Sequence, residues 1–488
     1  MIPQELRTSV FQLAVQGKLV EQRPEEGTGE ELFQQIYADK QALIKAGAFK
    51  KDKHLSEIAE DEIPFDIPDT WKWVRLDDVV TKSIKRGKSP TYAAKSGTLV
   101  FAQKCNTKAG YIDLDIALFL DESKLEKYPK EEFMQDKDIV INSTGNGTLG
   151  RVGVYRNKDN PRNLPIVPDS HVTVIRATES VATEYVYYVL KYYQPYMERL
   201  GTGSTNQREL SANVVRAMLF PVPPLAEQKR IVAKLEEILP LIDRYEAAWN
   251  KLEEFNKRFP GDMQKSILQL AIQGKLVEQR SEEGTGQAIF TQLIPYHKGL
   301  KPGKSELNLS SMEFDIPESW TMVELNQLFD FVDYRGKTPN KISDGVFLIT
   351  ASNIRQGFME YTRKEYISRE EYGSRQGRGI TEKGDLLFTT EAPMGNAALC
   401  DLDECSCGQR IITFKEYTKR TVVPALYMYF ILSPAFQQQL LDNCTGTTAK
   451  GIKADKLKHF LLPLPPYEEQ KRIIAKLEEI LPLCDRLK

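Results

Sequence analysis

Basic side chains interleaved with amides are the groups in this chain whose types and spacing could do chemistry. Residues 81–108 hold seven lysines or arginines and no acid, and further cations gather in residues 363–378 and 450–458. Lysine and arginine neutralise phosphates, while arginine, asparagine and glutamine can read base edges in the major groove. Because the basic stretches recur in both halves of the chain, nucleic-acid contact is about as well supported as a merely solvated surface. The net charge of −2 decides neither way, since local patches matter more than the total.

We predict DNA contacts at the basic and amide residues nearest to these landmarks. Asn146 belongs to the glycine-rich stretch Thr144–Gly150, whose spacing matches no nucleotide fingerprint, so a tight turn beside a binding surface is favoured over a phosphate cradle. The predicted residues of the first half are Lys85, Arg86, Lys88, Lys104, Asn106, Lys108, Asn146, Gln207 and Arg208. Those of the second half are Arg335, Lys337, Asn353, Arg355, Arg375, Arg378, Lys450 and Lys453.

Motifs for catalysis and for metal binding are missing from the sequence. It contains no GxxxxGK[ST] loop, no HExxH, no GxSxG with a plausible partner and no methyltransferase signature. Only four histidines are present, and none occupies matching positions in the two halves. Cys400, Cys405 and Cys407 have no histidine nearby and lack zinc-ribbon spacing, which favours buried, reduced thiols in a cytosol. We therefore predict neither catalytic residues nor metal ligands.

The elements that must position these residues are repeated along the chain. Ser9–Ile36 returns as Ser266–Leu293 with 19 of 28 positions identical, and Pro223–Arg244 returns as Pro465–Arg486 with 18 of 22 identical. Between the repeats lie two inserts that open alike and then diverge. Near-identical connectors around dissimilar inserts indicate one scaffold that holds two different readers.

The predicted fold class is α+β, with two mixed α/β domains separated by two antiparallel helical spacers in a circular, pseudo-twofold arrangement. The domain ranges are 1–61 (N-terminal helical spacer segment), 62–222 (first insert), 223–311 (central helical hairpin), 312–464 (second insert) and 465–488 (C-terminal spacer helix). Alternating apolar runs predict strands at Thr98–Ala102, Asp138–Asn142, His171–Ile175, Val346–Thr350 and Asp385–Thr390, with helices near Glu184–Leu200 and Pro424–Leu441.

The spacers should be helices paired through a heptad seam. The seam stays in phase across Pro240, so a kink there is favoured over a break. Turn residues at Arg258–Gly261 then predict that the seam helix folds back on Met263–Val277. By the same repeat order, the C-terminal helix should pair with the N-terminal segment. A chain with fused termini that is cut elsewhere should therefore still fold.

The motif at Pro223–Ile231, its return at Pro465–Ile473 and the segment Leu270–Val277 identify a family resemblance. With two divergent inserts, essentially the whole chain resembles the specificity subunit of type I restriction–modification systems. The resemblance implies double-stranded DNA as ligand, one target-recognition domain for each half of a split, asymmetric site, and a prokaryotic cytoplasm near the nucleoid. It implies two adenine-N6 methyltransferase subunits and restriction subunits as partners, which carry S-adenosylmethionine, ATP and magnesium, while this chain binds no cofactor.

The resemblance also makes the helical spacers a ruler and a docking surface for those partners. A helix over Leu225–Phe259 would span roughly 50 Å, which is one or more turns of a duplex. The docking residues would be the seam positions Ile231, Leu235, Ile238, Ile473, Leu477 and Ile480. Two rival readings stay open: a stand-alone DNA methyltransferase or nuclease with unfamiliar motifs, and a coiled-coil scaffold whose inserts bind protein.

Overall fold

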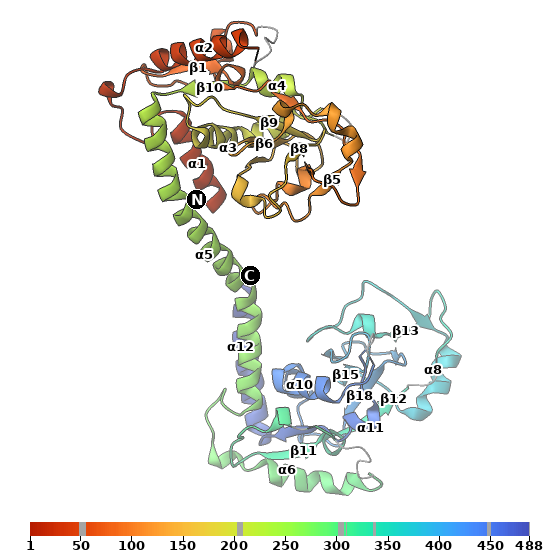
Figure 1. The fold of residues 1–488 in the computed structure, drawn as a ribbon. Coiled ribbons are helices and arrows are strands. Elements are labelled where there is room, and N and C mark those ends of the chain that lie inside the picture. The colour runs from red at the N-terminus through yellow and green to blue at the C-terminus, as the bar shows by residue number, and fades with distance from the viewer. Residues whose placement is uncertain are drawn as a thin grey trace. The chain divides into compact units, whose positions relative to one another are not determined.

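The duplication seen in the sequence is present in the fold (Figure 1). The computed structural model describes residues 1–47, 55–202, 208–300, 307–308, 310–334, 338–446 and 450–487. They form two units, Met1–Lys251 and Leu252–Lys488, and each unit combines helices with sheets. The predicted class of two mixed α/β domains is thereby confirmed. None of the described helices combines the length and the apolar character that crossing a bilayer requires.

The first unit has a two-stranded sheet and two four-stranded sheets. Their strand orders are β1-β10, β2-β9-β6-β7 and β3-β5-β4-β8. The elements are α1 (Pro3–Val15), α2 (Gly29–Lys45), β1 (Lys72–Arg75), β2 (Lys85–Arg86), β3 (Tyr92–Ala93), β4 (Leu99–Phe101), β5 (Leu118–Leu120), β6 (Ile139–Asn142), β7 (Val152–Val154), β8 (Ile166–Pro168), β9 (Val172–Ile175), α3 (Thr183–Leu200), α4 (Ala212–Ala217), β10 (Leu219–Val222) and the first part of α5 (Leu225–Ile272).

The second unit repeats this plan with sheets β11-β19, β12-β18-β15-β16 and β14-β13-β17. In each unit one parallel pair, β4 with β8 or β13 with β17, lies among otherwise antiparallel strands. After α5 come α6 (Gly286–Leu293), β11 (Thr321–Glu324), α7 (Leu325–Leu328), β12 (Phe329–Asp333), β13 (Val346–Ile349), β14 (Tyr366–Ile367), α8 (Arg369–Arg375), β15 (Leu386–Thr389), β16 (Ala397–Leu399), β17 (Ser406–Cys407), β18 (Ile411–Glu416), α9 (Pro424–Leu432), α10 (Pro434–Asn443), α11 (Ala454–Leu457), β19 (Leu461–Leu464) and α12 (Tyr467–Asp485).

The strands predicted from alternating apolar runs are all present, as β4, β6, β9, β13 and β15. The first predicted helix is α3, and the second is divided into α9 and α10, because Ser433 ends one and caps the next by accepting a hydrogen bond from the Phe436 amide. All four residues of β6 and of β15 are buried, so these central strands are covered on both faces.

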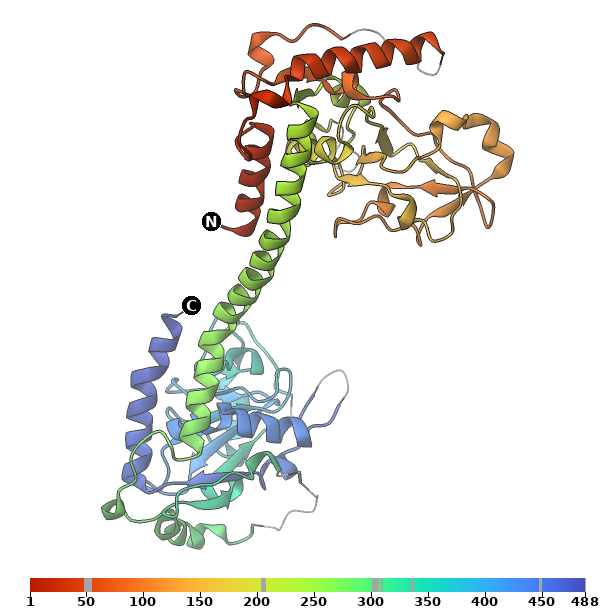
Figure 2. The same cartoon turned by 60° about the vertical axis from the view of Figure 1, so that its left-hand side comes forward.

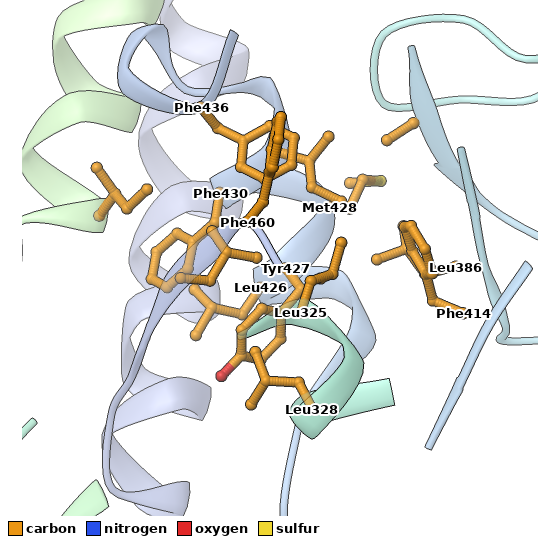
Figure 3. Packing of buried hydrophobic residues seen from close by; sticks show 14 of the residues in the cluster. Leu325, Leu328, Leu386, Phe414, Leu426, Tyr427, Met428, Phe430, Phe436 and Phe460 are labelled. Atoms are coloured by element: carbon orange, nitrogen blue, oxygen red, sulfur yellow. The ribbon is translucent and has the colours of Figure 1, made fainter. Parts of the chain in front are cut away.

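Each unit has its own hydrophobic core. In the second unit, aromatic rings from α9 and α10 pack together with leucines of α7, as Figure 3 shows. Tyr427 meets Phe430 edge-on with ring centroids 5.7 Å apart, and Phe436 meets Phe460 at the same separation. Fully burying a side chain of this size stabilises the fold by about 1.5–3 kcal/mol. The corresponding core of the first unit forms around Tyr185 and Phe220.

The predicted turn at Arg258–Gly261 is wrong. Leu225–Ile272 is one continuous helix, α5, which passes through both Pro240 and Pro260 (Figures 1 and 2). An interior proline removes a hydrogen bond and costs about 3 kcal/mol, but it does not stop a helix whose two ends are fixed elsewhere. The ends of α5 are fixed by burial, at Ile231 and Leu235 in the first unit and at Ala271 and Ile272 in the second.

The antiparallel helical pairs therefore have different members from those predicted. Arg7 of α1 forms ion pairs with Asp243 (2.7 Å) and Glu246 (3.0 Å) of α5, and α1 runs antiparallel to the first part of that helix (Figure 2). Near the end of α12, Asp485 accepts a hydrogen bond from Gln264 at 3.0 Å, and α12 runs antiparallel to the later part of α5 (Figure 2). Within its own unit, each terminal helix thus pairs with its half of α5.

The repeated sequence motifs attach these helices to the domains. Glu227 accepts hydrogen bonds from the Trp71 indole at 3.0 Å and from Gln22 at 2.5 Å. In the second unit Glu469 accepts from Trp320 and Gln279 at 3.0 and 2.6 Å. Both carboxyls are buried, and burial raises the pKa of each above its ordinary value even though the hydrogen bonds act to lower it.

A second repeated contact involves the arginine and the glutamine of the same motif. Arg230 forms a two-pronged ion pair with Glu26, and Arg472 does the same with Glu283, with N–O distances of 2.7 and 2.9 Å in both. Gln228 accepts a hydrogen bond from the Ala182 amide at 2.9 Å, as its counterpart in α12 does from the chain just before α9. The polar motif residues are therefore structural.

The repeated Gly-Thr-Gly segment places α2 and α6 against the two-stranded sheets. Thr28 and Thr285 cap these helices by accepting hydrogen bonds from amides of the first turn at 3.2 Å. The next residue must be glycine, because a Cβ on Gly29 would lie 2.0 Å from the Val222 carbonyl oxygen.

Candidate nucleic-acid interface

Loops at equivalent ends of the central sheets form a polar edge in each unit. In the first unit the polar edge comprises residues 143–150, 169–171, 202 and 208–209; in the second it comprises residues 390–396, 408–410, 445–446 and 450–451. The strand register makes the two equivalent, since Asn142 lies opposite Val172 and Thr389 lies opposite Ile411. Isolated bridges join Thr144 to residue 209 and Glu391 to residue 451. These bridges make Arg208 and Lys450 structural counterparts.

In the first unit, hydroxyl and imidazole groups meet at the polar edge. Thr144 Oγ1 lies 2.8 Å from His171 Nδ1, and the same hydroxyl donates to Gln103 at 3.1 Å. Gly145, with φ +98°, makes the sharp turn after β6 that the sequence led us to expect. Arg86 lies 2.5 Å from the Glu209 carboxylate, which ties strand β2 to this edge. The side chains gathered here are ones that can donate to and accept from a base.

In the second unit, the same position carries charged groups. Arg410 Nε donates to Glu391 at 2.9 Å, and Thr338 donates to the Gln409 side-chain oxygen at 3.0 Å. The turn borders a recess with a volume of about 350 Å³, which is also lined by Lys341 and Arg363. The two units thus present different chemistry on equivalent backbones.

Several predicted cations lie on the surface. Lys85 pairs with Glu132 at 2.6 Å, and Lys88 donates to the Lys127 carbonyl while its ammonium lies 5.6 Å from the centre of the Tyr128 ring. Such contacts hold the charges in place and leave them able to meet phosphates. The exposed members of the predicted set are Lys85, Lys88, Lys104, Lys108, Asn146, Arg378, Lys450 and Lys453.

Three other predicted arginines are half-buried and already have partners. Arg86 contacts Glu209, and Arg355 pairs with Glu360. Arg208 donates to the carbonyl oxygens of residues 199 and 201 at 3.0–3.2 Å. These contacts orient the guanidinium groups near the polar edge and neighbouring loops.

Asn106, Asn353 and Arg375 need correction, because the structure places them inside the domains. Asn106 is 1% exposed and donates to Asn142 and to the carbonyl oxygen of residue 151 at 3.2 and 3.0 Å. Asn353 is equally buried and fixes the turn after β13 through its Thr350 contacts. Arg375 is 2% exposed, and its guanidinium lies 4.7 Å from the centre of the Tyr334 ring. A buried, satisfied polar group cannot reach a base edge.

The predicted docking residues on the helical seam also need correction. Ile231, Leu235, Ile473 and Leu477 have no exposed surface. Ile238 and Ile480 are partly buried against the same cores. The heptad seam therefore faces the chain's own units, because burying an apolar stripe there stabilises each unit directly.

Buried charge also shapes the base of the basic run in residues 81–108. Burial lowers the pKa of Lys82, whose ammonium lies 3.5 Å from Glu132. Burial alone would raise the pKa of Glu132, but the hydrogen bond to Lys85 and the charge of Lys82 together hold it below the ordinary value. Lys82 is thus a structural cation, and the outer lysines carry the exposed positive charge.

Sequence reasoning missed His171, Gln409 and Arg410. Their only sequence signal is that each belongs to a polar pair directly before a strand, Ser170-His171 before β9 and Gln409-Arg410 before β18. These two pairs fall where the inserts no longer align. Strand register is what makes them equivalent. The predicted residues Gln207, Arg335 and Lys337 lie outside the described residues.

The cysteine group in the second unit matches its prediction as buried thiols. Cys400 and Cys405 are 2% and 1% exposed, with sulfurs 3.6 Å apart, and Cys407 is fully buried. Across the described ranges, no group of three or more histidine, cysteine, aspartate or glutamate side chains could hold a metal ion.

Comparison with a known protein family agrees with the duplicated plan. The family model described as the type I restriction modification DNA specificity domain matches residues 68–254 and 317–487. The chain is 24% identical to the type I restriction enzyme EcoAI specificity subunit of Escherichia coli, over 99% of this chain and 90% of that protein. It is also 24% identical to the EcoEI specificity subunit of the same organism, with the same coverage. A solved structure of the HsdS subunit from Thermoanaerobacter tengcongensis is similar at a TM-score of 0.46 and 18% identity, covering 87% of this chain and 92% of that one.

Proposed function

The chain belongs to the type I restriction modification DNA specificity family, and from this premise we propose that each of its units reads one half of a bipartite, asymmetric DNA site. The observation that carries the proposal is the double family match on a duplicated scaffold whose polar edges differ. Because the two units share a scaffold, they present their polar edges in equivalent ways. Because the two polar edges carry different side chains, they should select different bases. The recognised sequence should therefore not be a palindrome.

Phosphate contacts in this proposal come from the exposed lysines of each unit. Lys104 lies in the short helical turn Gln103–Cys105, beside the first polar edge, and Lys108 follows that turn. Lys450 belongs to the second polar edge, and Lys453 lies just beyond it. Such contacts hold a domain on the duplex without reading its sequence. The half-buried Arg86 and the loop residues around it are proposed to act nearer to the bases.

Under this proposal the chain supplies specificity and no catalysis. Adenine-N6 methyltransferase subunits, which use S-adenosylmethionine, and ATP- and magnesium-dependent restriction subunits would supply the chemistry. Because the seam is buried, we assign partner docking instead to exposed apolar residues of α5. Leu252, Phe255 and Phe259 are 50–55% exposed and share one face of the helix at spacings of three and four residues.

Salt dependence of DNA binding tests the proposal against a protein-binding scaffold. Affinity of the purified chain for duplex DNA should fall steeply with salt, and Lys104→Ala should reduce the slope of log affinity against log salt by about 1. Incubating the chain alone with DNA, labelled S-adenosylmethionine and divalent metal should transfer no label. Salt-independent binding would favour the scaffold, and transfer of label would favour a stand-alone enzyme.

A further inference from the structure

We propose that Gln409 and Arg410, at the turn between β17 and β18, are specificity-determining residues that read bases of one half-site, and that His171 does so at the equivalent turn of the other unit. This inference rests on the proposed function and names the residues through which it acts. The equivalence of the two turns cannot be seen in the sequence, because the inserts do not align there.

The backbone of the two turns is equivalent. The amide of Ser143 donates to the His171 carbonyl at 2.8 Å, and the amide of Thr390 donates to the Arg410 carbonyl at 2.9 Å. The side chains then cross to the neighbouring loop in the same way, His171 to Thr144 and Arg410 to Glu391. The scaffold therefore offers one side-chain position at the polar edge of each unit, with different chemistry in each.

Side-chain geometry at the second turn suits base reading. Glu391 engages Nε of Arg410, and the remaining four of the five N–H donors of a guanidinium belong to its two terminal nitrogens. Arginine uses such a fork on guanine O6 and N7, and glutamine reads adenine N6 and N7. The hydrogen bond from Thr338 orients the Gln409 amide before any ligand arrives. Both residues are exposed, so a duplex could reach them.

The electrostatics of the adjoining recess favour an anionic ligand. Lys341 and Arg363 both pair with Glu365, at 2.6 and 2.9 Å. Adding Arg410 with Glu391 gives three cations against two carboxylates, which leaves one net positive charge around the recess. A phosphate next to the bases being read would balance that charge. Base reading and binding of the DNA phosphate backbone would then take place at neighbouring positions.

Mapping methylated adenines in strains that carry single variants tests the assignment, with the source genome as the probe. In Arg410→Ala or Gln409→Ala strains, we expect one half of the split motif to become degenerate or to lose methylation, while His171→Ala should affect the other half. Lys383→Ala is the matched control, because Lys383 also forms an exposed ion pair in the same unit, 3.3 Å from Asp403, but precedes β15 and so lies at the opposite end of that strand from the polar edge. Its map should equal that of the wild type.

Binding of the purified full chain then separates base reading from phosphate contact. The probes are a duplex carrying the mapped motif and the same duplex with the affected half scrambled. Arg410→Ala should lower the ratio of the two affinities about 10-fold or more, as loss of a bidentate base contact does, and Arg410→Lys should lower it too, because lysine lacks the fork. Melting curves of the variants should match the wild type.

Three results would overturn the assignment: an unchanged map in both turn variants, equal weakening on both duplexes, or His171→Ala and Arg410→Ala altering the same half. Failure of the proposed function looks different. In that case the wild-type chain would direct methylation at no split motif, and deleting its gene would leave the map unchanged.

Discussion

At the residue scale, the strongest sequence signals mark structure and the weaker ones mark the proposed site. Glu227 and Glu469 lie within the most specific motif of the chain, yet each serves as a buried acceptor for a tryptophan indole. By residue type, Asn106 and Arg375 were predicted to read bases, but in the structure both are hydrogen-bond partners inside the domains. Residue type alone could not separate these cases, because burial depends on contacts between segments far apart in the sequence.

The raised pKa of Glu227 predicts how its replacement should respond to pH. A carboxyl whose pKa is raised by folding binds more protons in the folded state, so its contribution to stability is present below the unfolded pKa of about 4.3 and is lost as pH rises through the raised value. Glu227→Gln removes this titration. The free energy of unfolding of the variant, minus that of the wild type, should therefore increase as pH rises from about 4 to 7.

Urea unfolding at several pH values checks this, and Glu469→Gln should show the same trend, because the pKa of that carboxyl is raised for the same reason. A difference that does not change with pH in either variant would contradict the account of these buried acceptors.

At the element scale, strands and core helices followed from the sequence, whereas the helical connectors did not. Alternating apolar runs located β6 and β15, since both are short, buried and bounded by turns. Pro260-Gly261 suggested a turn because both residues disfavour helix interiors. The prediction failed because packing at the two ends of α5 outweighs a local preference, and that packing could not be seen in the sequence.

Gly261 offers a direct check on the continuous helix. An added Cβ there meets no atom within 4 Å, so Gly261→Ala should raise the free energy of unfolding by about 0.5–1 kcal/mol. Gly274 is the matched contrast, since its φ is +68° and a Cβ would lie 2.4 Å from Pro317. Gly274→Ala should be destabilising. Denaturant titration measures both, and a destabilising Gly261→Ala would favour the turn instead.

At the scale of the whole molecule, duplication is the organising feature. The sequence predicted two readers on one scaffold from its repeats, and the fold confirms two units in which two sheets have matching strand orders and the third differs by one strand. The proposed base-reading positions could be identified only from strand register, because the two inserts diverge most where their functions should differ. Each unit also has a separate core, so each unit should be open to destabilisation without the other.

Separate cores predict separate unfolding. Leu190→Ala, in the core of the first unit, should cost about 2–5 kcal/mol and lower the midpoint of one calorimetric transition. Leu440→Ala, equally buried in the second unit, should lower the midpoint of the other transition. If either substitution shifted both transitions by the same amount, the two cores could not be independent.

The most direct test of the central claim is a map of methylated adenines in the source genome with and without this gene. We predict that deletion removes methylation at one motif made of two different half-sites separated by a fixed number of unread bases. Restoring the gene should restore that motif. Identical maps in the two strains, or loss of methylation at a continuous or palindromic motif, would contradict the claim that two unlike units each read one half-site.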